Sequence, residues 1–105
     1  MEVEKQEENA AVVKPGGRVD ITNSQDLKNT LLSLYDEGYN TVTIDFSNVQ
    51  SIDSSGLGKL LLFQKKLRER GGELRIVNIT NDYVMKMFTL IQLNKVISIE
   101  GFENK

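Results

Sequence analysis

The sequence predicts one α/β domain over residues 1–105, with a mixed, mostly parallel sheet of four to five strands covered by three to four helices. A chain of 105 residues, 39% of them apolar and 27% charged, has room for one domain around one core. Segments with the two-residue period of strands alternate with segments at helical spacing, in the order ββαβαβαβ. Such alternation needs crossover connections, which make the later strands parallel and place helices over the sheet.

The predicted strands are short runs in which apolar residues alternate with polar ones or gather between turn residues. They are a weak first strand around Val3 and then residues 10–13, 18–21, 41–46, 74–79 and 96–99. Residues 1–9 are interpreted as that weak first strand or as a flexible N-terminus, with a polar turn at 7–9. Residues 47–51 are interpreted as a short bend, and residues 100–105 as a short C-terminal tail.

Three predicted helices follow from leucine-rich or aromatic stripes between a polar start and a glycine or polar stop. The first begins with Asn23 or Ser24 as its cap and ends at Gly38. The second begins near Ser55 and is stopped by residues 71–72. The expected inward stripes are Leu27, Leu31 and Leu34 in the first helix, Leu57, Leu60, Leu61 and Leu67 in the second, and Val84, Met87, Phe88 and Ile91 in the third.

Composition excludes several classes of function. The chain has no cysteine and no histidine, so disulfides, thiolate metal sites and Ser–His–Asp or Cys–His catalysis cannot be built. Its net charge of −2 argues against general affinity for nucleic acid. No apolar run approaches the roughly 20 residues that span a bilayer, and the acidic, polar start is not a secretory signal peptide. We therefore expect a cytoplasmic protein that contacts neither nucleic acid nor membrane.

A local excess of positive charge lies between residues 59 and 75. It consists of Lys59, Lys65, Lys66, Arg68, Arg70 and Arg75. Phe63 is the one aromatic residue of this stretch, and its neighbours suggest that it is buried, so no stacking platform for bases is evident. The favoured interpretation is the solvated face of a helix.

The segment "IDSSGLG" at 52–58 follows the strand 41–46 and opens the second helix. Asp53 or Ser54 can accept hydrogen bonds from the free amides of that helix, and Gly56 and Gly58 let the backbone pass close to a neighbour. Asp20 precedes the first helix in the same way. Because functional loops of such sheets lie beyond the carboxyl ends of the strands, the two loops are expected at one edge. Helix capping alone would explain these residue types.

The sequence resembles the STAS domain family, especially the bacterial anti-sigma factor antagonists. The resemblance rests on "FSNVQSIDSSGLG" at 46–58, "GGRVDITNS" at 16–24, "GGELRIVNIT" at 71–80 and the helix with its exit at 84–96. It covers about residues 10–99. It implies a single STAS-like domain with a last helix that is shortened or missing here. Gln92 stands where many members of the family have glycine.

The resemblance also implies partner switching. In that family the unphosphorylated antagonist binds an anti-sigma factor that is also a serine kinase, and so releases a sigma factor. The kinase phosphorylates the second serine of the motif, which matches Ser55, and a serine phosphatase restores the active form. The catalyst and its ATP belong to the partner, so this chain is expected to be no enzyme and to need no cofactor. The implied partner-binding residues are Asp20, Thr22, Asn23, Ser24, Asp53, Ser54, Ser55 and Gly56.

Three other interpretations stay open at this point. An enzyme could use Ser55 with Lys59 as a serine–lysine dyad, or could gather Mg²⁺ with carboxylates such as Asp20, Asp45 and Asp53. A phospho-aspartate receiver could use Asp45, although no acidic pair for magnesium follows an early strand. A STAS module without phosphorylation could serve as a scaffold subunit of a stress-signalling or lipid-transport complex.

Overall fold

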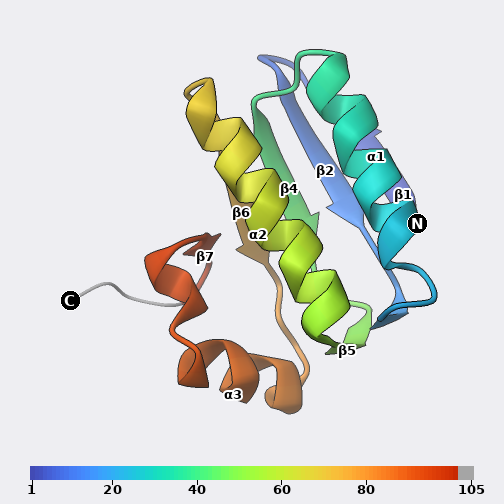
Figure 1. Ribbon diagram of the computed structural model, residues 1–105, viewed down its shortest axis with the longest axis vertical. Coiled ribbons are helices and arrows are strands. Elements are labelled where there is room, and N and C mark those ends of the chain that lie inside the picture. Colours follow the sequence, from blue (N-terminus) through green and yellow to red (C-terminus); the bar gives the residue numbers. More distant parts are fainter. Residues whose placement is uncertain (102–105) are drawn as a thin grey trace.

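A computed structural model of the protein describes residues 1–101 (Figure 1). The strands are β1 (Glu2–Lys5), β2 (Ala10–Lys14), β3 (Gly17–Val19), β4 (Thr41–Asp45), β5 (Val49–Ile52), β6 (Glu73–Val77) and β7 (Ser98–Ile99). The helices are α1 (Ser24–Asp36), α2 (Ser54–Glu69) and α3 (Asp82–Leu90), with a single 3₁₀ turn at Leu93–Lys95. The expected C-terminal tail and shortened last helix fall largely on residues 102–105, which lie outside the described residues.

The main sheet has five strands in the order β1-β2-β4-β6-β7, which confirms the predicted mixed, mostly parallel sheet. β1 is antiparallel to β2, and every other pair in this sheet is parallel. The β1–β2 hairpin turns through Glu8 and Asn9, which have φ of 62° and 61°. Two successive positive φ values are the geometry of the tight hairpin turns that match strand twist. The weak first strand and its polar turn are therefore present as predicted.

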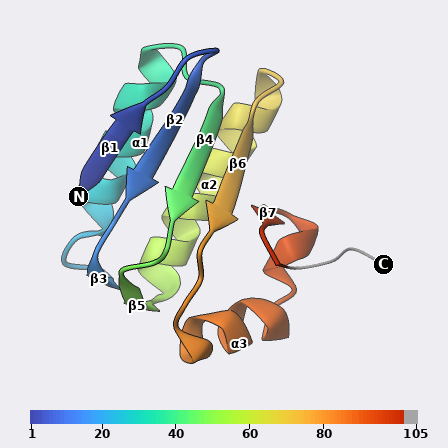
Figure 2. The ribbon, with the colours of Figure 1, turned by 180° about the vertical axis from the view of Figure 1, so that it is seen from behind.

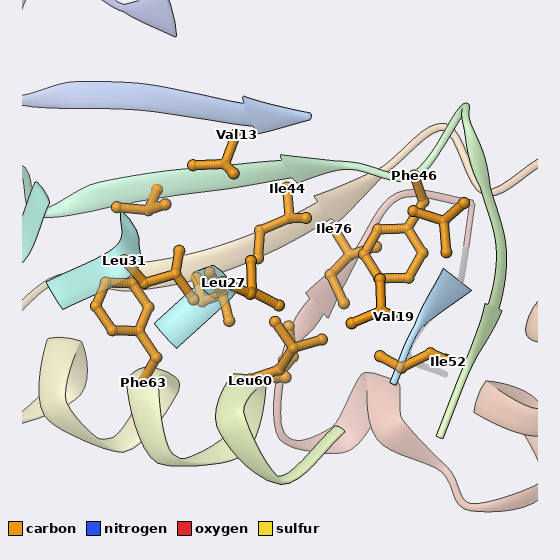
Figure 3. Packing of buried hydrophobic residues seen from close by; sticks show 14 of the residues in the cluster. Val13, Val19, Leu27, Leu31, Ile44, Phe46, Ile52, Leu60, Phe63 and Ile76 are labelled. Carbon is orange, nitrogen blue, oxygen red and sulfur yellow. The ribbon is translucent and has the colours of Figure 1, made fainter. Parts of the chain in front are cut away.

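Helices α1 and α2 lie side by side on one face of the main sheet, and no helix formed by residues 1–101 lies over the other face (Figures 1 and 2). The strand register explains this asymmetry. Ile44 of β4 lies opposite Val13 of β2 and Ile76 of β6, and all three side chains are fully buried. They form a layer under the helices, where Leu27 and Leu60 meet them (Figure 3). The strand positions that alternate with them, such as Val12, Thr43 and Arg75, are partly or fully exposed, as alternation requires.

Helix α3 closes the end of the sheet toward which the parallel strands run (Figure 2). The ring of Phe88 packs against that of Phe46, with ring centroids 5.7 Å apart. Beyond α3, Gln92 has φ 56° and ψ 42°, a left-handed conformation that glycine adopts without steric cost. Glycine, which the resemblance led us to expect at this position, would adopt this geometry without strain.

The predicted bend at residues 47–51 was wrong for residues 49–51. Val49–Ile52 form β5, which pairs in parallel with β3 in a separate two-stranded sheet. The buried residues of β5 are Val49 and Ile52, a spacing of three that does not have the period of a strand. Its partner lies some thirty residues away, so local sequence holds little trace of the pairing. This small sheet positions the functional site.

The predicted inward stripes of α2 and α3 are confirmed except at one position in each. In α2 the buried residues are Gly56, Leu60, Phe63, Gln64 and Leu67, whereas Leu61 is exposed. In α3 Val84 and Phe88 are buried and Met87 is partly buried, but Ile91 is exposed because the helix ends at Leu90. The last predicted strand, 96–99, is shortened to β7 because the 3₁₀ turn occupies the chain just before Val96.

Gln64 is a buried amide, 4% exposed, that joins α2 to two backbone groups. Its Oε1 accepts from the backbone amide of Leu74, at 2.8 Å, and its Nε2 donates to the carbonyl of Val96, at 2.7 Å. β7 pairs with β6 only from Arg75 onward. Gln64 thus provides a hydrogen-bond partner for the Leu74 amide, in the part of β6 that does not pair with β7.

Replacing Gln64 by leucine should destabilise the fold, because it leaves a buried N–H and a carbonyl without partners. We expect Gln64→Leu to lower the free energy of unfolding by about 2–4 kcal/mol, measured by urea denaturation. Lys65→Ala, at the exposed neighbouring position, should change it by less than about 0.5 kcal/mol. Equal stabilities of the two variants would contradict this role of Gln64.

Candidate functional site

The site forms where β3 and β5 end side by side. β3 leads through residues 20–23 into α1, and β5 leads through Asp53 into α2. The backbone amide of Asp53 donates to the carbonyl of Val19, at 3.0 Å, and the amide of Ile21 donates to Oδ2 of Asp53, at 3.2 Å. The predicted meeting of the Asp20 loop and the "DSSG" motif is therefore confirmed. It arises through the small β3–β5 sheet.

Asp53 is the N-cap of α2. Its backbone is extended, and its Oδ1 accepts from the amide of Gly56 at 3.0 Å. Of the two predicted capping residues, Asp53 has this role and Ser54 does not. Ser54 is the first helical residue, and its side chain is exposed. The other carboxylate oxygen of Asp53 accepts from the Ile21 amide, so Asp53 links the two loops.

Gly56 permits a close approach between α2 and the small sheet. A Cβ at this position would lie 2.6 Å from Cγ1 and 3.0 Å from the carbonyl oxygen of Val19, and 3.1 Å from the Ile52 side chain. Any larger residue would therefore push the start of α2 away from β3. The same expectation was wrong for Gly58, two residues on, where an added Cβ would meet no atom within 4 Å.

The Ser55 hydroxyl lies at the junction of α1 and α2. Its Oγ is 3.0 Å from Oγ of Ser24, the first residue of α1. Ser55 is half-buried, whereas Ser24 is only 3% exposed. The predicted acceptor is thus partly open to solvent and held on its inner side by a second hydroxyl.

The loop before α1 is closed by its own polar side chains. Oδ1 of Asp20 accepts from the Thr22 amide at 2.9 Å and from the Thr22 hydroxyl at 2.5 Å. These hydrogen bonds hold the pKa of Asp20 below its ordinary value, and the one from the Thr22 hydroxyl has the largest effect. The positive charge of Arg18 lowers this pKa further. Asn23 accepts from the Asp20 amide at 2.9 Å and donates to the Arg18 carbonyl.

The prediction that Asn23 or Ser24 caps α1 is correct in position but not in chemistry. Asn23 is the N-cap residue, yet its side chain makes no capping hydrogen bond. It binds the preceding loop instead, as just described. Ser24 also does not cap, because its hydroxyl points to Ser55.

Burial divides the eight predicted partner-binding residues. Thr22, Asp53 and Ser54 are exposed, and Asp20, Asn23 and Ser55 are half-buried. Ser24 and Gly56 are buried, so neither lies on the surface that a partner could cover. Both act inside the domain. Ile21, which sequence reasoning did not select, is 77% exposed between Asp20 and Thr22. An apolar residue inside an otherwise polar loop was the available signal.

The geometry gives no support to the catalytic alternatives. Within residues 1–101, no group of three or more His, Cys, Asp or Glu could hold a metal ion. A serine–lysine dyad would need the Ser55 hydroxyl to contact Lys59. That hydroxyl contacts Ser24 instead. Burial acts to raise the pKa of Asp45, but hydrogen bonds from the Ser47 amide and from Asn78 outweigh it and leave that pKa below its ordinary value. Asp45 is thereby a loop anchor at the end of β4.

Comparison with known proteins decides the family. The family model described as "STAS domain" matches residues 1–104. The chain belongs to the STAS domain family. The resemblance stated from the motif is therefore confirmed over almost the whole sequence. The helices of the described part of the chain include none that is long and apolar enough to cross a membrane.

Among curated proteins, this STAS domain is similar to the anti-sigma-B factor antagonist of Bacillus subtilis, with 28% identity over 97 residues that cover 92% of this chain and 87% of the relative. The corresponding Staphylococcus aureus protein is 28% identical over 92 residues, covering 87% of this chain and 84% of the relative. The names of these relatives describe a regulatory protein, in line with the expectation that this chain is no enzyme.

Among solved structures, the domain is similar to a putative anti-sigma factor antagonist from Thermotoga maritima, with a TM-score of 0.82 and 26% identity over 90% of this chain and 81% of that one. The Bacillus protein SpoIIAA in its phosphorylated form has a TM-score of 0.73 at 18% identity, over 93% of this chain and 88% of that one. The second likeness establishes the fold alone.

Gly56 and Gly58 form a matched pair for testing the close approach at the start of α2. Gly56→Ala should lower the free energy of unfolding by about 1–3 kcal/mol because its Cβ overlaps Val19. Gly58→Ala should raise it by about 0.5–1 kcal/mol, since alanine favours the helix and has space. Chemical denaturation of both variants measures this, and a neutral Gly56→Ala would refute the steric constraint.

The hydroxyl of Thr22 should be the main cause of the lowered pKa of Asp20. In Thr22→Val, which keeps the shape but loses the hydroxyl, we expect this pKa to rise toward its ordinary value, as followed by NMR titration of the carboxyl carbon. Because the folded pKa is depressed, the stability that the ionised loop provides is present above the unfolded pKa and is lost as pH falls through the folded one. Thr30→Val on α1 is the control and should leave the Asp20 titration unchanged.

Proposed function

We propose that this protein is a cytoplasmic anti-sigma factor antagonist that binds an anti-sigma factor when unphosphorylated and is switched off by phosphorylation of Ser55. The observation that most supports the proposal is the position of Ser55. Its hydroxyl lies in the first turn of α2, half-buried at the edge where two polar loops meet, within the motif that resembles the antagonists. The curated relatives with similar sequences bear that name.

The surface around Ser55 suits binding to another protein. Ile21 offers an exposed apolar side chain, and Thr22, Asp53 and Ser54 surround it with polar groups. An apolar anchor with a polar rim is the usual anatomy of a protein interface. The backbone of this surface is held in place by the Asp53 and Asp20 hydrogen bonds, so little ordering entropy is lost on binding.

Phosphorylation at Ser55 would act on the interface more than on the fold. A phosphoserine brings about −1.5 to −2 charges, which the free amides at a helix N-terminus tolerate. The same charge would face a partner beside two further carboxylates, Asp20 and Asp53. A loss of about 3 kcal/mol at the interface weakens affinity more than a hundredfold. Exclusion of the partner therefore needs no rearrangement of the domain.

The other reactions of the switch belong to partners in this proposal. The anti-sigma factor supplies the serine kinase activity and the ATP, and a serine phosphatase reverses the modification. One observation favours a second candidate, a STAS scaffold subunit that is not phosphorylated: the Ser55 hydroxyl is half-buried and bonded to Ser24, whereas Ser54 is exposed. A kinase must therefore turn the Ser55 side chain outward or reach it at the rim.

The test is a comparison of binding and phosphorylation at the two adjacent serines. An anti-sigma factor isolated from the same cells by pull-down would be incubated with the domain and ATP, and the phosphate located by mass spectrometry. We expect phosphate on Ser55, its loss in Ser55→Ala, and its retention in Ser54→Ala. Calorimetry should show near-native binding of Ser55→Ala and at least a hundredfold weaker binding of Ser55→Asp.

The opposite results separate the candidates. A domain that binds its partner equally well with serine or aspartate at position 55, and that acquires no phosphate, is a scaffold subunit. Phosphate on Ser54 alone would overturn the assignment of the acceptor.

A further inference from the structure

Ser24 is a buried hydroxyl that the fold itself does not require. Its side chain is 3% exposed, and with Gln64 it makes up the buried polar side chains of residues 1–101. It does not cap α1, whose N-cap is Asn23. Burying a hydroxyl costs free energy that its hydrogen bond must offset, whereas alanine would fit the same space at no such cost. The hydroxyl is therefore best explained by the atom that it contacts.

That atom is the Oγ of Ser55, at 3.0 Å. The two serines are among the first residues of their helices, α1 and α2, which lie side by side over the sheet (Figure 1). Ser24 is fixed by burial, while Ser55 is half-buried and has a solvent side. The contact thus joins a rigid inner hydroxyl to an outer one.

We propose that Ser24 is a positioning residue for the modification of Ser55: its hydroxyl holds the acceptor hydroxyl before transfer and donates a hydrogen bond to the phosphate afterwards. This inference rests on the proposed function. Before transfer either hydroxyl can be the donor, and the contact restricts the Ser55 side chain to one orientation. Within residues 1–101 no comparable hydrogen bond holds Ser54, whose side chain is exposed.

The transfer itself balances with the partner's ATP. The Ser55 oxygen attacks the terminal phosphorus, the bond from that phosphorus to ADP breaks, and the hydroxyl proton passes to a base of the kinase. The product is a phosphate ester that is a dianion above its second pKa, near 6. A dianionic phosphate has acceptor oxygens only, so the hydroxyl of Ser24 must then be the donor.

A donor of this kind favours the dianion over the monoanion and so lowers the second pKa of the phosphate. Other groups near the site act on the same pKa. Asp20 and Asp53 raise it, while the free amides of α2 and the cations one turn along each helix, Lys28 and Lys59, lower it. All of these stay in place when Ser24 is changed, so a Ser24 variant isolates the contribution of its hydroxyl.

The experiment uses the full chain with phosphoserine incorporated genetically at position 55, and follows the ³¹P NMR signal as pH is raised from 4 to 9. We expect Ser24→Ala to raise the second pKa of the phosphate by roughly half a unit to one unit. Ser24→Cys, which keeps the shape but has a weaker donor, should fall between the two. The matched control has phosphoserine at position 54, where Ser24→Ala should leave the pKa unchanged. Circular dichroism would verify that each variant is folded.

Identical titrations of the native and Ser24→Ala chains phosphorylated at position 55, or an equal shift with phosphoserine at 54, would overturn the inference. These outcomes are independent of partner binding. If phosphorylated Ser55 excludes the anti-sigma factor but the titrations coincide, the proposed function stands and the role of Ser24 fails. If the titrations differ but the phosphorylated chain binds as well as the native one, the role of Ser24 stands and the proposed function fails.

Discussion

The absence of a side chain at Gly56 is the constraint on which the site depends. It lets the first turn of α2 lie directly against Val19, so that the start of α2 packs closely on β3 and β5. Asp53 can then cap α2 with one carboxylate oxygen and bind the Ile21 amide with the other. With α2 in that position, Ser55 reaches Ser24 across the gap between the helices. A steric contact without specific chemistry thus determines where the Ser55 hydroxyl lies.

The polar groups of the site have distinct physical roles. The carboxylates of Asp20 and Asp53 accept backbone amides and so shape the loops, and the lowered pKa of Asp20 shows that this loop favours its ionised form. The hydroxyl of Ser55 contacts that of the buried Ser24 on its inner side and is partly open to solvent on the other. The site therefore combines loops held by their own hydrogen bonds with one partly exposed hydroxyl.

Much of this arrangement could be predicted from the sequence. The alternation of Val42, Ile44 and Phe46 located the central strand, and the glycine–serine motif after it located the start of α2. The pairing of β5 with β3 could not be found, since a two-residue period is missing from Val49 to Ile52 and the partner is distant. The Ser24–Ser55 contact is tertiary in the same way: Ser24 has the appearance of an ordinary helix cap until α2 is placed beside it.

The two edge strands of the main sheet affect how readily the domain aggregates at high concentration. β1, on one border, consists of exposed residues, of which Glu2, Glu4 and Lys5 are charged, and β7, on the other, has two residues. Charged or very short outer strands are poor templates for the strands of another molecule. The two borders therefore disfavour the pairing of one copy of the domain with another, so that the domain can reach high concentration without aggregating through its sheet.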